Sequence, residues 1–106
     1  MLKMNFNQKV YDLLLTLPNG RVITYGALAE MLGNKQLARA VVGNALHKNP
    51  DGERYPCYKG VNSRGDLSRA YAFGGFGEQQ RRLEAEGIAV ENGRVDLKRY
   101  GYDEEQ

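Results

Sequence analysis

Cys57, the only cysteine of the chain, follows Pro56 and is the residue best suited to covalent chemistry. One cysteine cannot form an internal disulfide, so its side chain is either a small buried hydrophobe or a thiol kept for chemistry. Composition alone favours the buried hydrophobe. A reactive role needs an activating neighbour, because a thiol of pKa about 8.5 is only a few per cent thiolate at pH 7.

The residues that follow Cys57 are Tyr58 and Lys59. A tyrosine of pKa about 10 is a poor general base at neutral pH, whereas the Lys59 ammonium could stabilise a thiolate directly. The single histidine, His47, lies ten residues before the cysteine. We interpret His47 as a helix C-terminal cation or a phosphate contact and not as the base.

Other common kinds of site lack the residues they need. One cysteine and one histidine cannot supply a structural zinc site, and a Ser-His-Asp set would require His47. No phosphate-binding glycine motif follows a strand. We therefore expect neither a metal ion nor a cofactor.

Three helical patterns precede Cys57 and would position it. Residues 6–17 carry one apolar stripe that stops at Pro18, and Thr24 is a plausible N-cap for a short helix over residues 25–32. Gly33 and Asn34 end that helix, and another follows over about residues 36–47. Two short helices joined by a turn that contains glycine predict a helix-turn-helix.

The outward face of the helix over residues 36–47 combines small and cationic residues. By helical spacing it holds Gln36, Arg39, Ala40, Gly43 and His47. Ala40 and Gly43 leave the backbone bare beside an arginine, which suits close approach of a DNA groove. A neighbouring segment of the same protein could pack there instead, and the pattern does not separate the two.

Downstream of this helix, residues 48–77 show little periodicity and many Gly, Pro and Asn residues. A loop of that length in a compact domain is usually functional. A short helix is then expected over residues 78–86 with Gly87 at its cap. Asn92-Gly93 predicts a type I′ turn in a small hairpin.

The bulk properties describe one ordinary globular domain. The chain has 106 residues, of which 42% are apolar and 26% charged. No apolar run could cross a membrane and no signal peptide is recognisable, so we expect a cytoplasmic protein. The net charge is +2, and residues 35–69 hold seven cations against three carboxylates. That basic region suits phosphate binding, although a solvated basic surface explains it as well.

Six short patterns occur in a specific order and spacing. They are Thr24-Tyr25-Gly26 and Ala38-Arg39-Ala40-Val41 at helix starts, Asn49-Pro50, Pro56-Cys57, a turn with Ser63 and Gly65, and Glu86-Gly87 at a helix end. Together they resemble the alkylguanine-DNA alkyltransferases and their non-enzymatic relatives, the alkyltransferase-like proteins, over about residues 6–87.

The resemblance implies a mainly α-helical winged helix-turn-helix with a small β-hairpin, formed by residues 1–106 as a single domain. Such a domain enters the minor groove, flips the alkylated guanine out of the stack and places it beside the cysteine. Arg39 matches the arginine that fills the gap, and Tyr25 matches the tyrosine that pushes on the adjacent phosphate. From the residues alone, a surface ion pair for Arg39 and core packing for Tyr25 would be favoured.

The sequence departs from the enzymes of this family at the decisive place. Their motif is Pro-Cys-His-Arg-Val, in which the histidine removes the thiol proton through water and a glutamate orients the histidine. Here Tyr58, Lys59 and Gly60 follow Cys57. Glu86 matches the glutamate but has no histidine to orient, which favours a surface carboxylate at a helix end.

Three functions are compatible with this sequence. The first is a monomeric lesion sensor that binds duplex DNA with alkylated guanine and marks it for excision-repair proteins, as alkyltransferase-like proteins do. Its lesion pocket would be lined by Asn49, Pro56, Cys57 and Tyr58, with Tyr71 or Phe73 stacking on the flipped base. Alkyltransferase-like proteins usually replace the cysteine, so the rival is a single-turnover methylated-DNA-protein-cysteine methyltransferase with Cys57 as alkyl acceptor. The third is a general helix-turn-helix DNA binder or regulator whose pocket is filled by Tyr58.

Overall fold

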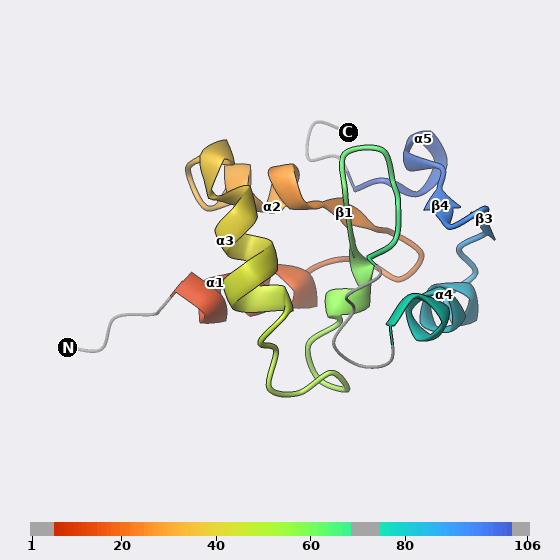
Figure 1. The fold of residues 1–106 in the computed structure, drawn as a ribbon, viewed down its shortest axis with the longest axis horizontal. Helices are drawn as coiled ribbons and strands as arrows, with labels where there is room; N and C mark the ends of the chain where they lie inside the picture. The colour runs from red at the N-terminus through yellow and green to blue at the C-terminus, as the bar shows by residue number, and fades with distance from the viewer. Residues whose placement is uncertain (1–5, 69–74, 103–106) are drawn as a thin grey trace.

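The computed structural model describes residues 6–68 and 75–102, and Figure 1 shows two groups of elements. On one side lie the helices α1 (Phe6–Leu15), α2 (Tyr25–Met31) and α3 (Ala38–Ala40). On the other side lie α4 (Gly75–Ala85), β3 (Val90–Glu91), β4 (Arg94–Val95) and α5 (Leu97–Tyr100). Between the two groups runs the cysteine segment, residues 55–61. It contains the 3₁₀ turn η3 (Cys57–Lys59) and the short strand β2 (Gly60–Val61). The cysteine therefore lies where the two halves of the fold meet.

Helix α1 (Phe6–Leu15) supplies the centre of the first core cluster. Val10 and Leu14 are fully buried and Tyr11 nearly so, which confirms the predicted apolar stripe. The helix ends slightly earlier than predicted, because the amides of Thr16 and Leu17 bond to carbonyls only three residues back. Such bonds tighten the last turn of a helix into 3₁₀ geometry ahead of Pro18.

The predicted helix-turn-helix is present. Thr24 caps α2 (Tyr25–Met31) by accepting a hydrogen bond from the Ala27 amide at 3.1 Å. Gly33 has a φ of +106°, and the Asn34 amide bonds back to the Ala29 carbonyl. That left-handed residue at the helix end is what the Gly33-Asn34 pair predicted, and it turns the chain into the next helix.

The second helix of the motif is less regular than predicted. One continuous helix was expected over residues 36–47, but the chain forms the 3₁₀ turn η1 (Lys35–Leu37), the α-turn α3 (Ala38–Ala40) and the π-helix η2 (Val41–Leu46). Packing against α1 outweighs regular helix geometry here. Val41 and Ala45 are completely buried, and the Tyr11 hydroxyl donates to the Ala45 carbonyl at 2.8 Å, a group that a helix end leaves unpaired.

A second core cluster joins the cysteine segment to the C-terminal half. Its buried members are Val22, Val61, Leu67, Leu83, Ile88 and Val95. Strand β1 (Ile23–Thr24) pairs in parallel with β2, with Ile23 opposite Gly60. Tyr58 packs against both clusters, so this residue links the two halves of the core.

The C-terminal half forms the wing. The strands β3 (Val90–Glu91) and β4 (Arg94–Val95) make the predicted antiparallel hairpin, and Asn92 and Gly93 both have positive φ, as a type I′ turn requires. Helix α4 (Gly75–Ala85) starts earlier than predicted, and Gly87 follows it with a φ of +86°. The turn α5 (Leu97–Tyr100), capped by Asp96, was not predicted.

Candidate functional site

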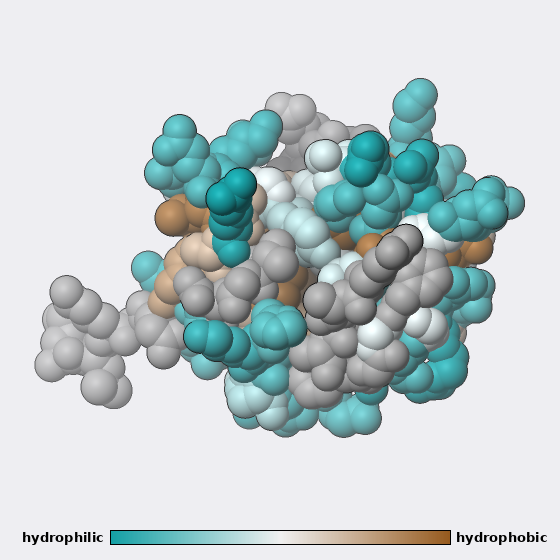
Figure 2. Space-filling view, in the orientation of Figure 1, coloured by the Kyte–Doolittle hydropathy of each residue, from teal (hydrophilic) through white to brown (hydrophobic). Residues whose placement is uncertain are grey.

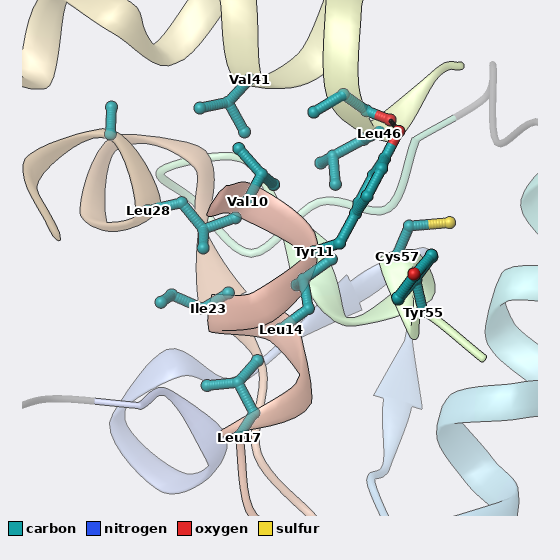
Figure 3. Packing of buried hydrophobic residues seen from close by; sticks show 12 residues of the cluster. Val10, Tyr11, Leu14, Leu17, Ile23, Leu28, Val41, Leu46, Tyr55 and Cys57 are labelled. Carbon is teal, nitrogen blue, oxygen red and sulfur yellow. Dashed lines mark hydrogen bonds between the residues drawn. The ribbon is translucent and has the colours of Figure 1, made fainter. Parts of the chain in front are cut away.

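Cys57 begins η3 directly after Pro56 and is 4% exposed. Its amide donates to the Tyr55 carbonyl at 2.7 Å, and the Tyr55 ring stacks on Tyr11 with centroids 4.7 Å apart. In Figure 3 the sulfur points away from Val10 and Leu14, beside these two aromatic rings. The thiol thus belongs to the edge of the first core cluster, where aromatic side chains fix its surroundings.

Tyr58 stands directly beside the cysteine and reaches Glu86. Its hydroxyl donates to Glu86 Oε2, across 28 residues of sequence. Glu86 Oε1 accepts from the Gly20 amide at 3.1 Å and lies 3.2 Å from the Lys59 ammonium. Glu86 is therefore the centre of a polar cluster that also contains Tyr58, Lys59 and the amide of Gly20, called here the Glu86 cluster.

The expectation that Glu86 would be a surface carboxylate is wrong. Its side chain is only 11% exposed, and that of Lys59 is 5% exposed. The physical reason is compensation: a buried carboxylate is tolerated when a buried cation and hydrogen-bond donors surround it. The Lys59 ammonium also donates to the Pro18 carbonyl at 3.2 Å. The cation proposed for stabilising a thiolate is thus held by Glu86 and Pro18.

The Tyr58–Glu86 contact limits what the site can do to a thiol. An imidazole has two ring nitrogens and can donate to a carboxylate with one while the other accepts a proton. A phenol has one polar end, and the Tyr58 hydroxyl is directed at Glu86. In the Glu86 cluster the carboxylate is thus occupied by the Tyr58 hydroxyl, and this phenol acts as a hydrogen-bond donor and not as a base.

Asn49 stabilises the loop that leads to the cysteine. Its side chain is buried, donates to the Tyr55 carbonyl at 2.9 Å and accepts from the Asp51 amide at 2.9 Å. The same Tyr55 carbonyl accepts from the Cys57 amide. Asn49 thereby holds both ends of the loop over residues 49–55 and fixes the start of the cysteine segment.

Tyr25 opens α2 and lies over the cysteine segment. A Cβ placed on Gly60 would lie 3.2 Å from Tyr25 Cε1 and 3.0 Å from Leu46 Cδ1, so the ring packs directly on the Gly60 backbone. Burial raises the pKa of the Tyr25 phenol, a hydrogen bond with the Ser68 side chain lowers it, and nearby Cys57 raises it. Tyr25 is therefore half-buried beside the cysteine and not purely a surface residue.

The predicted DNA-facing residues lie on the helix-turn-helix side of the molecule. Gln36, Arg39 and His47 are exposed, and Ala40 is half-buried. Gly43 lies inside η2. Among residues 6–68 and 75–102, no carboxylate lies within ion-pair distance of Arg39, whereas Lys59 is paired. Where the face drawn in Figure 2 is coloured, hydrophilic residues predominate over hydrophobic ones.

Gln79, a fully buried polar residue of α4, was not predicted as part of the site. Its amide donates to the Tyr58 and Gly60 carbonyls, and its carbonyl oxygen accepts from the Ser68 amide. The available signal was its spacing four residues before Leu83, which puts a polar side chain on the buried face of the helix. Tyr71 and Phe73, the predicted pocket wall, lie outside the described residues.

None of the helices in the described part of the chain has the length and apolar character of a membrane span.

Comparisons with known proteins agree on one family. Residues 5–88 match the model described as "6-O-methylguanine DNA methyltransferase, DNA binding domain".

Individual relatives include both enzymes and base-flipping proteins. The chain is 47% identical to the bifunctional methyltransferase/endonuclease of Picrophilus torridus over 88% of its own length, but it spans only 30% of that protein. It is 36% identical to the DNA base-flipping protein of Vibrio parahaemolyticus, over 90% of this chain and 93% of that one.

A solved structure matches over nearly the entire length of both chains. The crystal structure of S. pombe Atl1, in complex with damaged DNA containing O6-carboxymethylguanine, superposes with a TM-score of 0.82 at 31% identity. The match covers 96% of this chain and 99% of that chain. The winged helix-turn-helix predicted from the sequence is confirmed by this likeness.

Proposed function

Since the chain belongs to the family of the 6-O-methylguanine DNA methyltransferase DNA-binding domain, we propose that it binds duplex DNA containing O-alkylated guanine as a lesion sensor. Base flipping from the minor groove would place the lesion beside Cys57. The single observation that supports the sensor function is the Tyr58–Glu86 contact. By the motif match, this phenol would stand where the enzymes have their histidine. The likeness to a protein crystallised on such DNA supports the ligand.

The roles of the site residues are part of this proposal. Gln36, Arg39, Ala40, Gly43 and His47 form the DNA-contact surface, with Arg39 filling the gap in the stack. The exposure of Arg39 and the absence of an ion pair to it among the described residues suit that role. Tyr25 pushes on the phosphate next to the lesion.

The lesion pocket is proposed to lie over the cysteine segment. Pro56, Cys57 and Tyr58 line it, Asn49 holds the loop before it, and Tyr71 or Phe73 stacks on the flipped base. The buried position of Asn49 and its hydrogen bond to the Tyr55 carbonyl support the role given to Asn49.

A second candidate is single-turnover methyl transfer to Cys57. The observations that favour it are the retained cysteine and the identity to the methyltransferase/endonuclease of Picrophilus torridus. In that reaction the O–CH₃ bond of the guanine breaks, an S–CH₃ bond forms, and the proton lost by the thiol ends on the guanine. The reaction requires a thiolate, for which the Glu86 cluster supplies no base.

Intact-protein mass spectrometry after mixing with a duplex that contains O6-methylguanine separates these functions. The sensor is expected to bind that duplex more tightly than an undamaged one in gel shifts, with no change in mass. A gain of one methyl group, about 14 Da, on Cys57 within minutes would falsify the sensor function and require another way of holding the thiolate. Equal binding of both duplexes would indicate a general DNA binder.

A Cys57→Ser variant provides the matched control. If the sulfur only lines the pocket, this variant should bind the methylated duplex almost as well as the wild type.

A sensor of this kind is proposed to act as a monomeric, cytoplasmic single domain over residues 1–106 and to mark the lesion for excision-repair proteins.

A further inference from the structure

Gln79 connects helix α4 to two other parts of the site. Its side-chain nitrogen donates to the Tyr58 carbonyl at 3.0 Å and to the Gly60 carbonyl at 3.1 Å. Its side-chain oxygen accepts from the Ser68 amide at 2.8 Å. Gln79 is 1% exposed, so water does not compete for these bonds. One side chain thus fixes the backbone on both sides of Lys59 and the position of Ser68.

Ser68 continues the connection to the helix-turn-helix. The Ser68 side chain lies close enough to the Tyr25 phenol to lower its pKa, and the Tyr25 ring packs on Gly60, whose carbonyl accepts from Gln79. Gln79 therefore reaches Tyr25 by two routes, one through Ser68 and one through the Gly60 backbone. The aromatic ring at the start of α2 and the cysteine segment share one buried support.

We propose that Gln79 is a positioning residue for lesion selectivity, which holds the cysteine segment, Ser68 and, through them, Tyr25 in the arrangement that accepts a flipped alkylated base. This inference rests on the proposed lesion-binding function. It assigns the selectivity to a residue of α4 that needs no contact with DNA. General affinity for duplex DNA is assigned to the other residues of the DNA-contact surface, Gln36, Ala40, Gly43 and His47, and does not depend on Gln79.

A primary amide is the side chain that these contacts require. It offers two N–H donors for the two carbonyls and one oxygen for the Ser68 amide. Methionine has a similar length and fills the same space, but it leaves both carbonyls and the Ser68 N–H without this partner. Buried backbone groups that lose their partner shift to recover one, so the cysteine segment and Ser68 should move.

The experiment compares Gln79→Met and Ser68→Ala with the wild type and with Gln80→Met. Gln80 is the neighbouring residue of α4 and bonds only to Glu84 among the contacts that the described residues show, so it controls for the substitution itself. Dissociation constants are measured for a duplex with one O6-methylguanine and for the same duplex with guanine. Thermal unfolding establishes that each variant is folded at the binding temperature.

We expect Gln79→Met to reduce the ratio of the two dissociation constants about tenfold, while binding to the undamaged duplex changes little. Ser68→Ala keeps the Ser68 amide, which Gln79 holds, but removes the hydroxyl that acts on the Tyr25 phenol, so a smaller loss of the same ratio is expected. Gln80→Met should keep the wild-type ratio. If Gln79→Met does not fold, Ser68→Ala decides alone.

The measured ratios distinguish a failure of the role proposed for Gln79 from a failure of the proposed lesion-binding function. A wild type that prefers the methylated duplex, together with unchanged ratios in the folded variants, overturns the role of Gln79 and leaves the proposed function intact. Equal loss of affinity for both duplexes also overturns it, because a general structural defect would act on both. A wild type without preference overturns the proposed function, and this inference falls with it.

Discussion

The α2–α3 region, residues 25–40, and the cysteine segment both carry cations, but the surroundings of these cations differ. Arg39 is exposed and has no carboxylate partner among the described residues, whereas Lys59 is buried against Glu86. The first region is held mainly by apolar packing against α1, and its polar side chains Gln36, Arg39 and His47 are exposed. The second is held by polar contacts within the protein. Changes in the second should therefore cost stability, and changes in the first should affect DNA binding.

Removal of the Glu86 carboxylate should have the largest effect on the difference between the two regions. Glu86→Leu leaves the Lys59 ammonium with the Pro18 carbonyl but without its counter-charge, and it removes the acceptor of the Tyr58 hydroxyl. Breaking a buried ion pair in this way typically costs about 3–5 kcal/mol. Urea unfolding of the variant and the wild type measures the loss.

Glu84 provides the control, because it is an exposed glutamate of α4 two residues earlier. Glu84→Leu should change the free energy of unfolding by no more than about 0.5 kcal/mol, as surface substitutions usually do. If the two variants lose similar stability, the Glu86 cluster does not hold the cysteine segment.

Tyr58→His tests whether a histidine beside Cys57 is sufficient to produce methyl transfer to the thiol. A histidine could donate to Glu86 with one ring nitrogen and present the other to Cys57, which is the general-base arrangement that a phenol cannot provide. Such assistance is typically worth about 10²–10⁴-fold in rate. The rate of methylation of Cys57 is followed by intact mass.

Tyr58→Phe is the matched control, since it removes the hydroxyl and adds no base. Its transfer rate should stay at the wild-type level. Equal rates in Tyr58→His and Tyr58→Phe would show that Glu86, held by Lys59, does not orient the new imidazole.

Arg39→Ala tests the open region. The variant should lose preference for methylated over undamaged duplex by about 1–3 kcal/mol, because its proposed task is to fill the stack and not to neutralise phosphate. Arg81→Ala, an exposed arginine of α4, should keep the preference. Equal losses on both duplexes with a flatter salt dependence would instead assign Arg39 to a phosphate contact. Neither variant should unfold the protein.

The features predicted correctly from the sequence are those that local rules decide. Thr24 as N-cap, Gly33 after α2 and the Asn92-Gly93 turn follow from the conformations that these residue types prefer. The π-helical geometry of η2 could not be predicted, because it results from contacts with α1 such as the Tyr11–Ala45 hydrogen bond, 34 residues apart.

The candidate site also combines features that local sequence predicts with features that depend on distant contacts. Cys57 and Tyr58 could be identified from the motif, but their surroundings depend on residues far apart in the chain. Gly20 and Glu86 are 66 positions apart, and Gln79 reaches the cysteine segment from α4. Strands of two residues such as β1 and β2 carry no periodicity, so the pairing that brings Ile23 to Gly60 had no sequence signal.

The smallest expected effect concerns an ion pair on the surface of α4, and it sharpens the contrast with the buried Lys59–Glu86 pair. Hydrogen bonds from Arg81 and then Arg82 lower the pKa of the Glu78 carboxyl from 4.5 to about 2. A carboxyl with a lowered pKa stabilises the fold above its unfolded-state pKa, and the contribution is lost as the pH falls through the folded-state value. The stabilisation by Glu78 should thus be complete above about pH 4.5 and disappear toward pH 2.

Melting temperatures of the wild type and Glu78→Gln measure this contribution in low salt. The wild type should melt slightly higher at pH 7, and the difference should vanish near pH 2. It should also shrink in high salt, because the Arg81 side chain is 69% exposed and its charge is screened. The deficit of Glu86→Leu should persist in high salt, since that pair is shielded from solvent. A difference for Glu78→Gln that is independent of both pH and salt would show that the substitution acts through the helix itself and not through the ion pair.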